Sequence, residues 1–135
     1  MSAPRSLKTE EKMTLIEAIN RINELRPNTY SLPEKVKWLS TLDGIIKAEI
    51  IDTHEGAEEC VFVEYDEKTD LATELLVHAP YDDVYLKWLE AQIDRANGEY
   101  ARYNNSASAF NSALSTFQRY YNRTHMPLGS RVKFF

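Results

Sequence analysis

Apolar positions in the first half of the chain recur at helical spacing and predict two short helices. Thr14 followed by Glu17 is a capping-box pattern that starts the first helix, and Pro27 prevents this helix from continuing. Ser31 with Glu34 repeats the pattern at the start of the second helix. The loop between them is short, so we expect the two helices to be antiparallel. The predicted apolar faces consist of Leu15, Ile16, Ile19, Ile22 and Leu25 in the first helix and Val36, Leu39, Leu42, Ile46 and Ile50 in the second.

Residues 54–70 lose this periodicity and predict a long acidic loop. Their sequence, HEGAEECVFVEYDEKTD, is rich in carboxylates and has a single apolar island at 61–65. The alternating pattern of this island is compatible with a brief strand, and so is the pattern over 74–77. A small hairpin of these two segments is one alternative, and an irregular loop is the other. Pro80 ends the extended region.

The apolar stripe resumes over residues 81–127, with steps of three and four throughout. Asp82 or Asp83 can cap the new helix, because a negative charge suits the positive end of the helix dipole. Asn104, Asn105 and Ser106 are poor helix formers, so local sequence favours a break there whereas the periodicity favours continuation. A single helix over 81–122 would be about 63 Å long, more than a domain of this size covers. We favour the break at 104–106 and keep the single helix as the alternative.

These elements predict a mainly α fold. The domain at residues 13–127 is expected to be four-helix bundle-like, and the long acidic loop, with or without a short β-hairpin, connects its second and third helices. Residues 1–12 lack apolar periodicity and predict a flexible N-terminal arm. Residues 128–135 predict an extended basic and aromatic tail. A chain of 135 residues buries enough surface to fold without disulfides or metal, and the single cysteine, Cys60, has no partner within the chain.

Charge is divided unevenly along the chain. From Tyr100 to Phe135 there are five Arg or Lys and no Asp or Glu, whereas residues 1–99 carry eleven basic and twenty-one acidic residues. The formal net charge is −5. Cations near the C-terminus of the last helix are favoured by its dipole, which accounts for part of this division. The remainder predicts contact with an acidic partner, either another subunit or a polyanion.

The sequence also indicates where the protein resides. The first residues, MSAPRSLKTEEK, are too polar for the apolar core of a signal peptide. No apolar run approaches the roughly 18 to 20 residues that a membrane helix requires. We therefore expect a soluble protein of the cytoplasm that does not associate with membranes.

Patterns for catalysis or metal binding are weak. His54 lies near several carboxylates and Cys60, but this spacing matches no zinc or calcium loop. Asp82 and Asp83 are explained by capping, and the three histidines, at 54, 78 and 125, are scattered without a nucleophile elbow. The chain also has no glycine-rich phosphate loop. We expect a protein that is not an enzyme, with no catalytic, cofactor-binding or metal-binding residues.

The candidate functional residues are those of an interface at the C-terminal end. The tail alternates cationic and apolar residues, which suits docking on an acidic neighbour. Tyrosine is enriched at interfaces because its ring is apolar while its hydroxyl stays hydrated, although core packing is the alternative for the same rings. The candidate interface consists of Arg119, Tyr120, Tyr121, Arg123, His125, Arg131, Lys133, Phe134 and Phe135.

Distinctive runs of residues are spread over most of the chain. They are Leu75-Leu76-Val77, Pro80-Tyr81-Asp82, Trp88 to Asp94, Gly98-Glu99-Tyr100, Tyr103 to Ser106, Phe110-Asn111 and Tyr120 to Pro127. In this combination the chain, over about residues 13–127, resembles small proteins encoded among the head genes of tailed phages and prophages. In particular, it resembles their head-to-tail connector, or neck, proteins. The chain has His78 where proline is common in that family.

The resemblance implies a structural virion protein that assembles into a ring between portal and tail. Its partners would be further copies of itself, the portal and tail-proximal neck proteins, with DNA passing through without specific binding. Assembly would take place in the bacterial cytoplasm, and the resemblance carries over no catalytic residues. The alternative is a nucleic-acid-binding phage or host accessory module, in which the basic C-terminal third contacts phosphates and tyrosines stack on bases. The acidic remainder of the chain weighs against that alternative.

Overall fold

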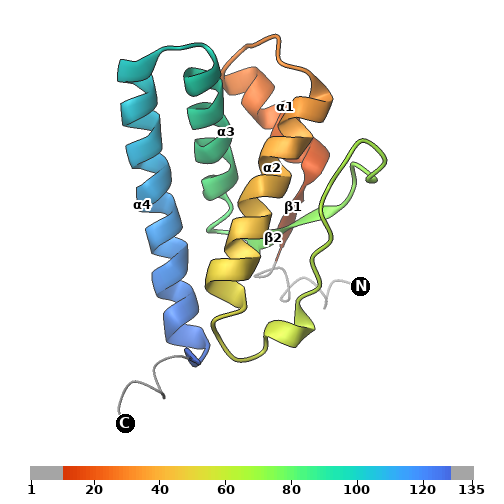
Figure 1. The fold of residues 1–135 in the computed structure, drawn as a ribbon, viewed down its shortest axis with the longest axis vertical. Coiled ribbons are helices and arrows are strands. Elements are labelled where there is room, and N and C mark those ends of the chain that lie inside the picture. Colours follow the sequence, from red (N-terminus) through yellow and green to blue (C-terminus); the bar gives the residue numbers. More distant parts are fainter. Residues whose placement is uncertain (1–10, 129–135) are drawn as a thin grey trace, which may run out of the picture.

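A computed structural model of the chain describes residues 11–128 and is mainly helical (Figure 1). The predicted fold class is confirmed, because these residues form four α-helices and a small two-stranded antiparallel sheet. Residues 1–10 of the predicted arm and residues 129–135 of the predicted tail lie outside the described residues. In chain order the elements are β1 (Lys12–Thr14), α1 (Leu15–Leu25), α2 (Leu32–Ile46), the π-helical turn η2 (Lys47–Ile51), the 3-10 turn η3 (Ala57–Glu59), β2 (Glu74–His78), α3 (Asp83–Ala96) and α4 (Tyr100–Thr124).

The first two helices begin where the sequence predicts. The Thr14 hydroxyl accepts a hydrogen bond from the backbone N–H of Glu17, and the Glu17 carboxylate accepts one from the backbone N–H of Thr14. At the start of α2, the Ser31 hydroxyl accepts from the backbone N–H of Glu34. Each cap satisfies backbone donors that the first helical turn leaves without a partner. Both predicted starts are therefore confirmed.

The strand at Glu74–His78 has a different partner from the one considered in the sequence. It pairs antiparallel with β1, so that Lys12 lies opposite His78 and Thr14 lies opposite Glu74. Residues 61–65 form no strand. The sheet therefore joins the start of the domain to the end of the acidic loop.

Pairing with β1 is favoured because the segments that flank the two strands are also joined by backbone hydrogen bonds, one of them at the start of α1. The backbone N–H of Leu15 bonds to the carbonyl of Thr73 at 3.0 Å, and the N–H of Ala79 bonds to the carbonyl of Glu11 at 2.8 Å. Val61 remains 80% exposed, so its segment gains little apolar burial. Residues 11 and 12, assigned to the flexible arm from the sequence, are thus held by β2.

Helices α3 and α4 form a hairpin whose break lies at 97–99, not at 104–106 as we favoured. Gly98 has a φ of +74°, a left-handed conformation typical of the residue that ends a helix. The backbone N–H groups of Gly98 and Glu99 bond to the carbonyls of Arg95 and Asp94. Asn104 to Ser106 lie inside α4, where the Ser106 hydroxyl donates to Asp94 Oδ2 at 2.8 Å. The tertiary contact of Ser106 outweighs its weak helix preference.

Substituting Gly98 with alanine is expected to lower the free energy of unfolding by about 1 kcal/mol. The cause is backbone strain, because a residue with a Cβ adopts the left-handed region at a cost of about 1 kcal/mol. The added methyl group itself would meet no atom within 4 Å. Urea denaturation measures the change, and Gly98→Asn serves as the control because asparagine tolerates this conformation better. An alanine variant as stable as the original chain would contradict the left-handed turn.

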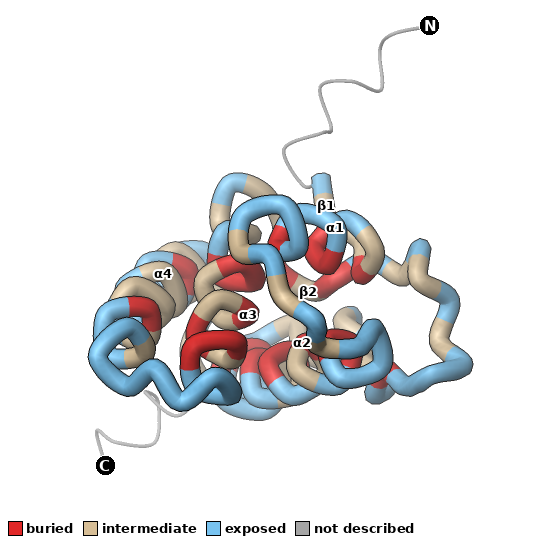
Figure 2. The backbone as a smooth tube through the Cα atoms, turned by 90° about the horizontal axis from the view of Figure 1, so that it is seen from above, coloured by how far each residue is buried: buried red, intermediate tan, exposed pale blue. Residues whose placement is uncertain are grey.

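The core lies between α1, α2, α3 and β2, and α4 covers one edge of it (Figures 1 and 2). Helix α4 packs mainly on α3, and of its own residues only Ser106 and Phe117 are buried. No described helix has the length and apolar character to cross a membrane. The fully buried apolar side chains include Leu15, Ile19, Ile22, Leu39, Leu42, Ile46, Leu75, Val77, Val84, Tyr85, Leu89 and Ile93.

Candidate functional site

The cationic residues predicted at the end of α4 are accessible. Arg119 and Arg123 are exposed, and neither lies within salt-bridge distance of a described carboxylate. Arg119 donates to the Ser115 hydroxyl one turn earlier at 2.9 Å. These two guanidinium groups are available to an acidic partner. The other cationic and apolar candidates, Arg131, Lys133, Phe134 and Phe135, lie outside the described residues.

Tyr120 and Tyr121, also predicted as interface residues, pack largely within the domain. The Tyr120 ring stacks on Tyr81 at 4.6 Å, and its hydroxyl lies 3.1 Å from Nε2 of His78. The Tyr121 ring stacks on His125 at 3.9 Å. These half-buried rings attach the last turns of α4 to the segment between β2 and α3 and to the helix end. Core packing therefore accounts for most of their contacts, while their remaining edges are open to solvent.

His54, considered as a metal ligand in the sequence, has a structural role. It is buried, its Nδ1 lies 2.6 Å from the carbonyl oxygen of Ile50, and its Nε2 lies 2.7 Å from Oδ1 of Asn122. It also meets the Tyr121 ring edge to face at 5.0 Å. No group of three His, Cys, Asp or Glu side chains within residues 11–128 is arranged to hold a metal ion. His54 fastens η2, which follows α2, to the end of α4.

A buried carboxylate that the sequence gives no sign of lies at the centre of the domain. Asp43 of α2 is 0% exposed. Its oxygens accept hydrogen bonds from the hydroxyls of Tyr65 at 2.6 Å and Tyr85 at 2.7 Å, and from the backbone N–H of Leu76 at 3.1 Å. The Tyr85 hydroxyl in turn accepts from the N–H of Val77 at 2.7 Å. Asp43 thereby joins α2 to the acidic loop, to β2 and to α3.

Burial dominates the ionisation of this cluster. It raises the pKa of Asp43, because the charged form loses its hydration, while the bonds from Tyr65, Tyr85 and Leu76 act in the opposite direction. Burial and the nearby carboxylate both raise the pKa of Tyr65 and of Tyr85, so both phenols keep their protons near neutral pH. The two hydroxyls therefore act as donors to Asp43.

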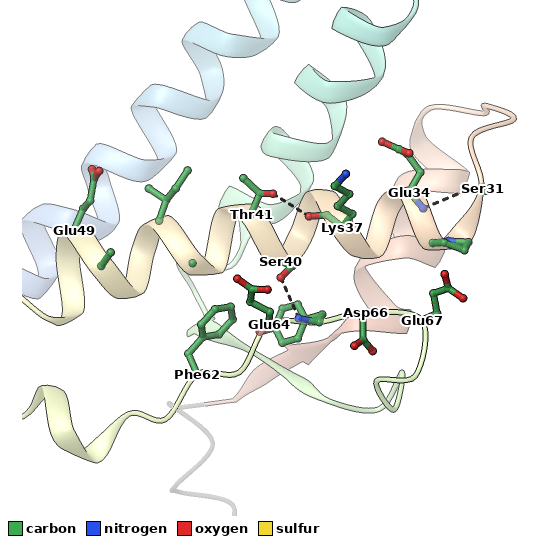
Figure 3. A pocket seen from close by; sticks show the side chains of 15 residues that line it. Ser31, Glu34, Lys37, Ser40, Thr41, Glu49, Phe62, Glu64, Asp66 and Glu67 are labelled. Atoms are coloured by element: carbon green, nitrogen blue, oxygen red, sulfur yellow. Dashed lines mark hydrogen bonds between the residues drawn. The ribbon is translucent and has the colours of Figure 1, made fainter.

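A groove of about 770 Å³ lies between the outer face of α2 and the following loop (Figure 3). Its floor includes Gly44 and Ile45 of α2 and Ala48 of η2, and Phe62 lies on the loop side. Lys37 is the one cation among the described residues that line it. Its five carboxylates belong to Glu34, Glu49, Glu64, Asp66 and Glu67.

The loop wall of this groove, which we call the acidic groove, is fixed by the Asp43 cluster. The backbone N–H of Tyr65 donates to the Ser40 hydroxyl at 3.0 Å, in addition to the bond between Tyr65 and Asp43. The Phe62 ring packs edge to face on Tyr65 at 5.4 Å. The loop is thus held against α2 at its centre, and the groove is formed before any partner binds.

The carboxylates of the acidic groove are exposed and none of them is in an ion pair with a described residue. Five negative charges with one lysine give a field that attracts cations and repels nucleic acid. In Figure 1 the later part of the loop (green) lies on the right and α4 (blue) lies on the left, while the start of the loop meets the end of α4 through His54 and Asn122. The domain therefore carries an acidic groove beside α2 and, separately, exposed arginines at the end of α4.

Sequence reasoning located the cationic surface but not the acidic groove. The signal for the groove was present as the carboxylates of the loop, but the carboxylates on the helical wall are too far away in sequence to be assigned to the same surface.

No family model, curated protein or solved structure matches this chain. The fold therefore defines the class: a mainly helical domain with an acidic groove beside α2 and exposed arginines at the end of α4.

Proposed function

We propose that this protein is a structural subunit of a tailed-phage virion, a head-to-tail connector that assembles into a ring between portal and tail. The observation that carries the proposal is that one domain has both a preformed acidic groove and, at the end of α4, two exposed arginines without an ion pair to a described carboxylate. Surfaces of this kind favour contacts in which each subunit offers one surface to the next, and such contacts form a ring when the rotation between neighbouring subunits closes. The resemblance to connector proteins supports the same assignment.

The remaining features of the proposal follow from charge and packing. A protein with a net charge of −5 does not retain passing DNA by attraction, since DNA binding relies on Lys and Arg. The rings of Tyr120 and Tyr121 hold the end of α4 in place, so Arg119 and Arg123 are presented from a fixed helix. The partners of this surface would be a further subunit and the portal, in a particle assembled in the bacterial cytoplasm.

The proposal predicts oligomers whose mass rises with concentration, and rings when portal protein is present. Light scattering coupled to gel filtration measures the mass, and negative-stain imaging detects the rings. Raising the ionic strength is expected to weaken the assembly because the contacts between the charged surfaces are screened. A protein that stays strictly monomeric and does not bind portal would contradict the proposal.

The second candidate is a nucleic-acid-binding module, and the observation in its favour is the absence of acidic residues from α4. Arg119 and Arg123 are exposed on this helix, and Arg102 is exposed beside Glu99. A DNA mobility shift that weakens with salt would support this candidate. If DNA mobility does not change at low salt while the protein forms oligomers in the same buffer, the nucleic-acid-binding candidate is excluded and the structural role remains.

A further inference from the structure

We propose that the acidic groove receives residues 129–135 of a second copy of this chain. This inference rests on the proposed function in one respect, because a ring needs a contact in which each copy binds the next. It adds which segment of one copy and which groove of the next form that contact. The bound segment would be Gly-Ser-Arg-Val-Lys-Phe-Phe, and its receptor would be the space between α2 and residues 62–67.

Charge is the first argument for this occupant. The acidic groove has five exposed carboxylates and one lysine, and it lacks ion pairs with described residues. The segment 129–135 contains Arg131 and Lys133 and no acidic side chain. Charge-complementary surfaces of this kind direct association and fix its register. Arginine is well suited to the role because its guanidinium group can bond two carboxylate oxygens at once.

The alternation of side chains along the segment is the second argument. In an extended chain successive side chains point to opposite sides, so Arg131 and Lys133 face one way while Val132 and Phe134 face the other. The groove offers partners for both sides. Glu64, Asp66 and Glu67 stand on the loop wall, whereas Gly44 and Ile45 of α2 and Ala48 of η2 form an apolar strip on the helical wall, which also carries Glu34 and Glu49. An extended segment would therefore place its cations on the loop and its apolar side chains on the helix.

Length is the third argument. The groove follows α2 from Ser31 to Glu49, a span of about 27 Å at 1.5 Å per residue. Seven residues in extended conformation span about 23 Å. The segment thus fits the groove along its whole length. Because the loop wall is already held by the bonds of Tyr65, binding would order the segment but not the receptor, which lowers the free-energy cost.

The position of Leu128 favours a tail from a neighbouring copy. Its N–H bonds to the carbonyl of Thr53 at 2.8 Å, beyond the Glu49 end of the groove. Figure 3 places Glu67 toward the opposite end, near Ser31. In its own chain the cation at position 131 would lie only about 10 Å from Leu128, far short of that end. A neighbour's tail has no such tether and can align with the loop carboxylates.

Peptide binding tests the contact independently of ring formation. The probe is a fluorescein-labelled peptide of residues 128–135, LGSRVKFF, and fluorescence anisotropy is the readout. The receptor is the full chain carrying Arg131→Glu and Lys133→Glu, so that its own tail does not compete. We expect saturable binding that weakens at least tenfold when Glu64→Lys and Glu67→Lys are added. These two glutamates make no side-chain hydrogen bond or ion pair with described residues, so their replacement leaves the fold intact.

The control variant is Glu24→Lys with Glu58→Lys, which changes the net charge equally at exposed glutamates outside the groove. It is expected to bind the peptide as before. Equal loss in the groove and control variants, or no saturable binding, would overturn the inference. Neither result would contradict the proposed ring, which is tested by mass and imaging of the unmodified protein.

Mixing full-length chains distinguishes a neighbour's tail from the chain's own tail. A groove variant (Glu64→Lys, Glu67→Lys) and a tail variant (Arg131→Glu, Lys133→Glu) should each need at least tenfold higher concentration to assemble with portal. Mixed in equal amounts, they should assemble again, because the original tail of one meets the original groove of the other and the two reversed surfaces also match. Assembly unaffected by either variant, or failure of the mixture to recover, would overturn the contact between copies.

Discussion

Replacing Asp43 with alanine is expected to lower the free energy of unfolding by about 4 kcal/mol. The substitution removes the shared acceptor of three buried donors, and each unsatisfied buried group costs about 1 to 3 kcal/mol. The donors are the hydroxyls of Tyr65 and Tyr85 and the N–H of Leu76. Urea denaturation at neutral pH measures the loss. Hydrogen exchange should show faster exchange of the Tyr65 amide, since the loop is released from α2.

Tyr65→Phe is the matched control for this substitution. It removes one donor and leaves Asp43 with two, so we expect a loss of about 1 kcal/mol. If Asp43→Ala lowers the free energy of unfolding no more than Tyr65→Phe does, Asp43 does not hold the loop, β2 and α3 together. Because the loop forms one wall of the acidic groove, Asp43→Ala should also weaken binding of the LGSRVKFF peptide.

The titration of Asp43 is expected to make the stability of the protein depend on pH. Its pKa is raised in the folded protein, so its contribution is fully present below the unfolded pKa, about 3.9, and is lost as pH rises through the folded pKa. The Asp43→Asn variant lacks this titration. We therefore expect the free energy of unfolding of the original chain, relative to Asp43→Asn, to decrease as pH rises from about 4. A difference that increases over this range would contradict the raised pKa.

Replacing Arg26 with alanine is expected to lower the free energy of unfolding by about 3 kcal/mol. Arg26 follows α1 and forms ion pairs with Asp94 and with Glu90, the latter at 3.2 Å. Asp94 is 0% exposed, and without Arg26 its one remaining side-chain partner among the described residues would be the Ser106 hydroxyl. Removing one member of a buried ion pair is costly because the other charge stays buried without compensation. Thermal and urea denaturation of the variant measure the loss.

Arg21→Ala is the control for the loss of one positive charge. Arg21 is exposed on α1 and lies in no ion pair with a described carboxylate, so we expect a change within about 0.5 kcal/mol. The pKa of Arg26 is raised mainly by its bond to Asp94, so Arg26 keeps the positive charge of this pair at neutral pH, where the denaturation is measured. Equal losses in the two variants would contradict the role of Asp94.

Local sequence patterns were sufficient where a few neighbouring residues decide the outcome. The capping residues Thr14 and Ser31 mark the starts of α1 and α2, because their side chains bond backbone groups three residues away. A brief strand over 74–77 was one of two alternatives that the sequence left open, the other being an irregular loop. The break between α3 and α4 was indicated as well, but it was placed at 104–106. The pair Asn97-Gly98 carried the decisive signal, since glycine readily adopts the left-handed turn that ends a helix.

Contacts between residues distant in sequence decided the other features. The partner of β2 is β1 because the start of α1 brings Leu15 to the carbonyl of Thr73, which no local pattern indicates. The acidic groove combines Glu34 of α2 and Glu49 of η2 with carboxylates of the loop, and Asp43 holds that loop through Tyr65. Sequence by itself determined the starts of α1 and α2, the acidic loop and the cationic C-terminal third. Only the tertiary structure brought the scattered carboxylates into one surface, because burying Asp43 with its three donors fixes the loop against α2.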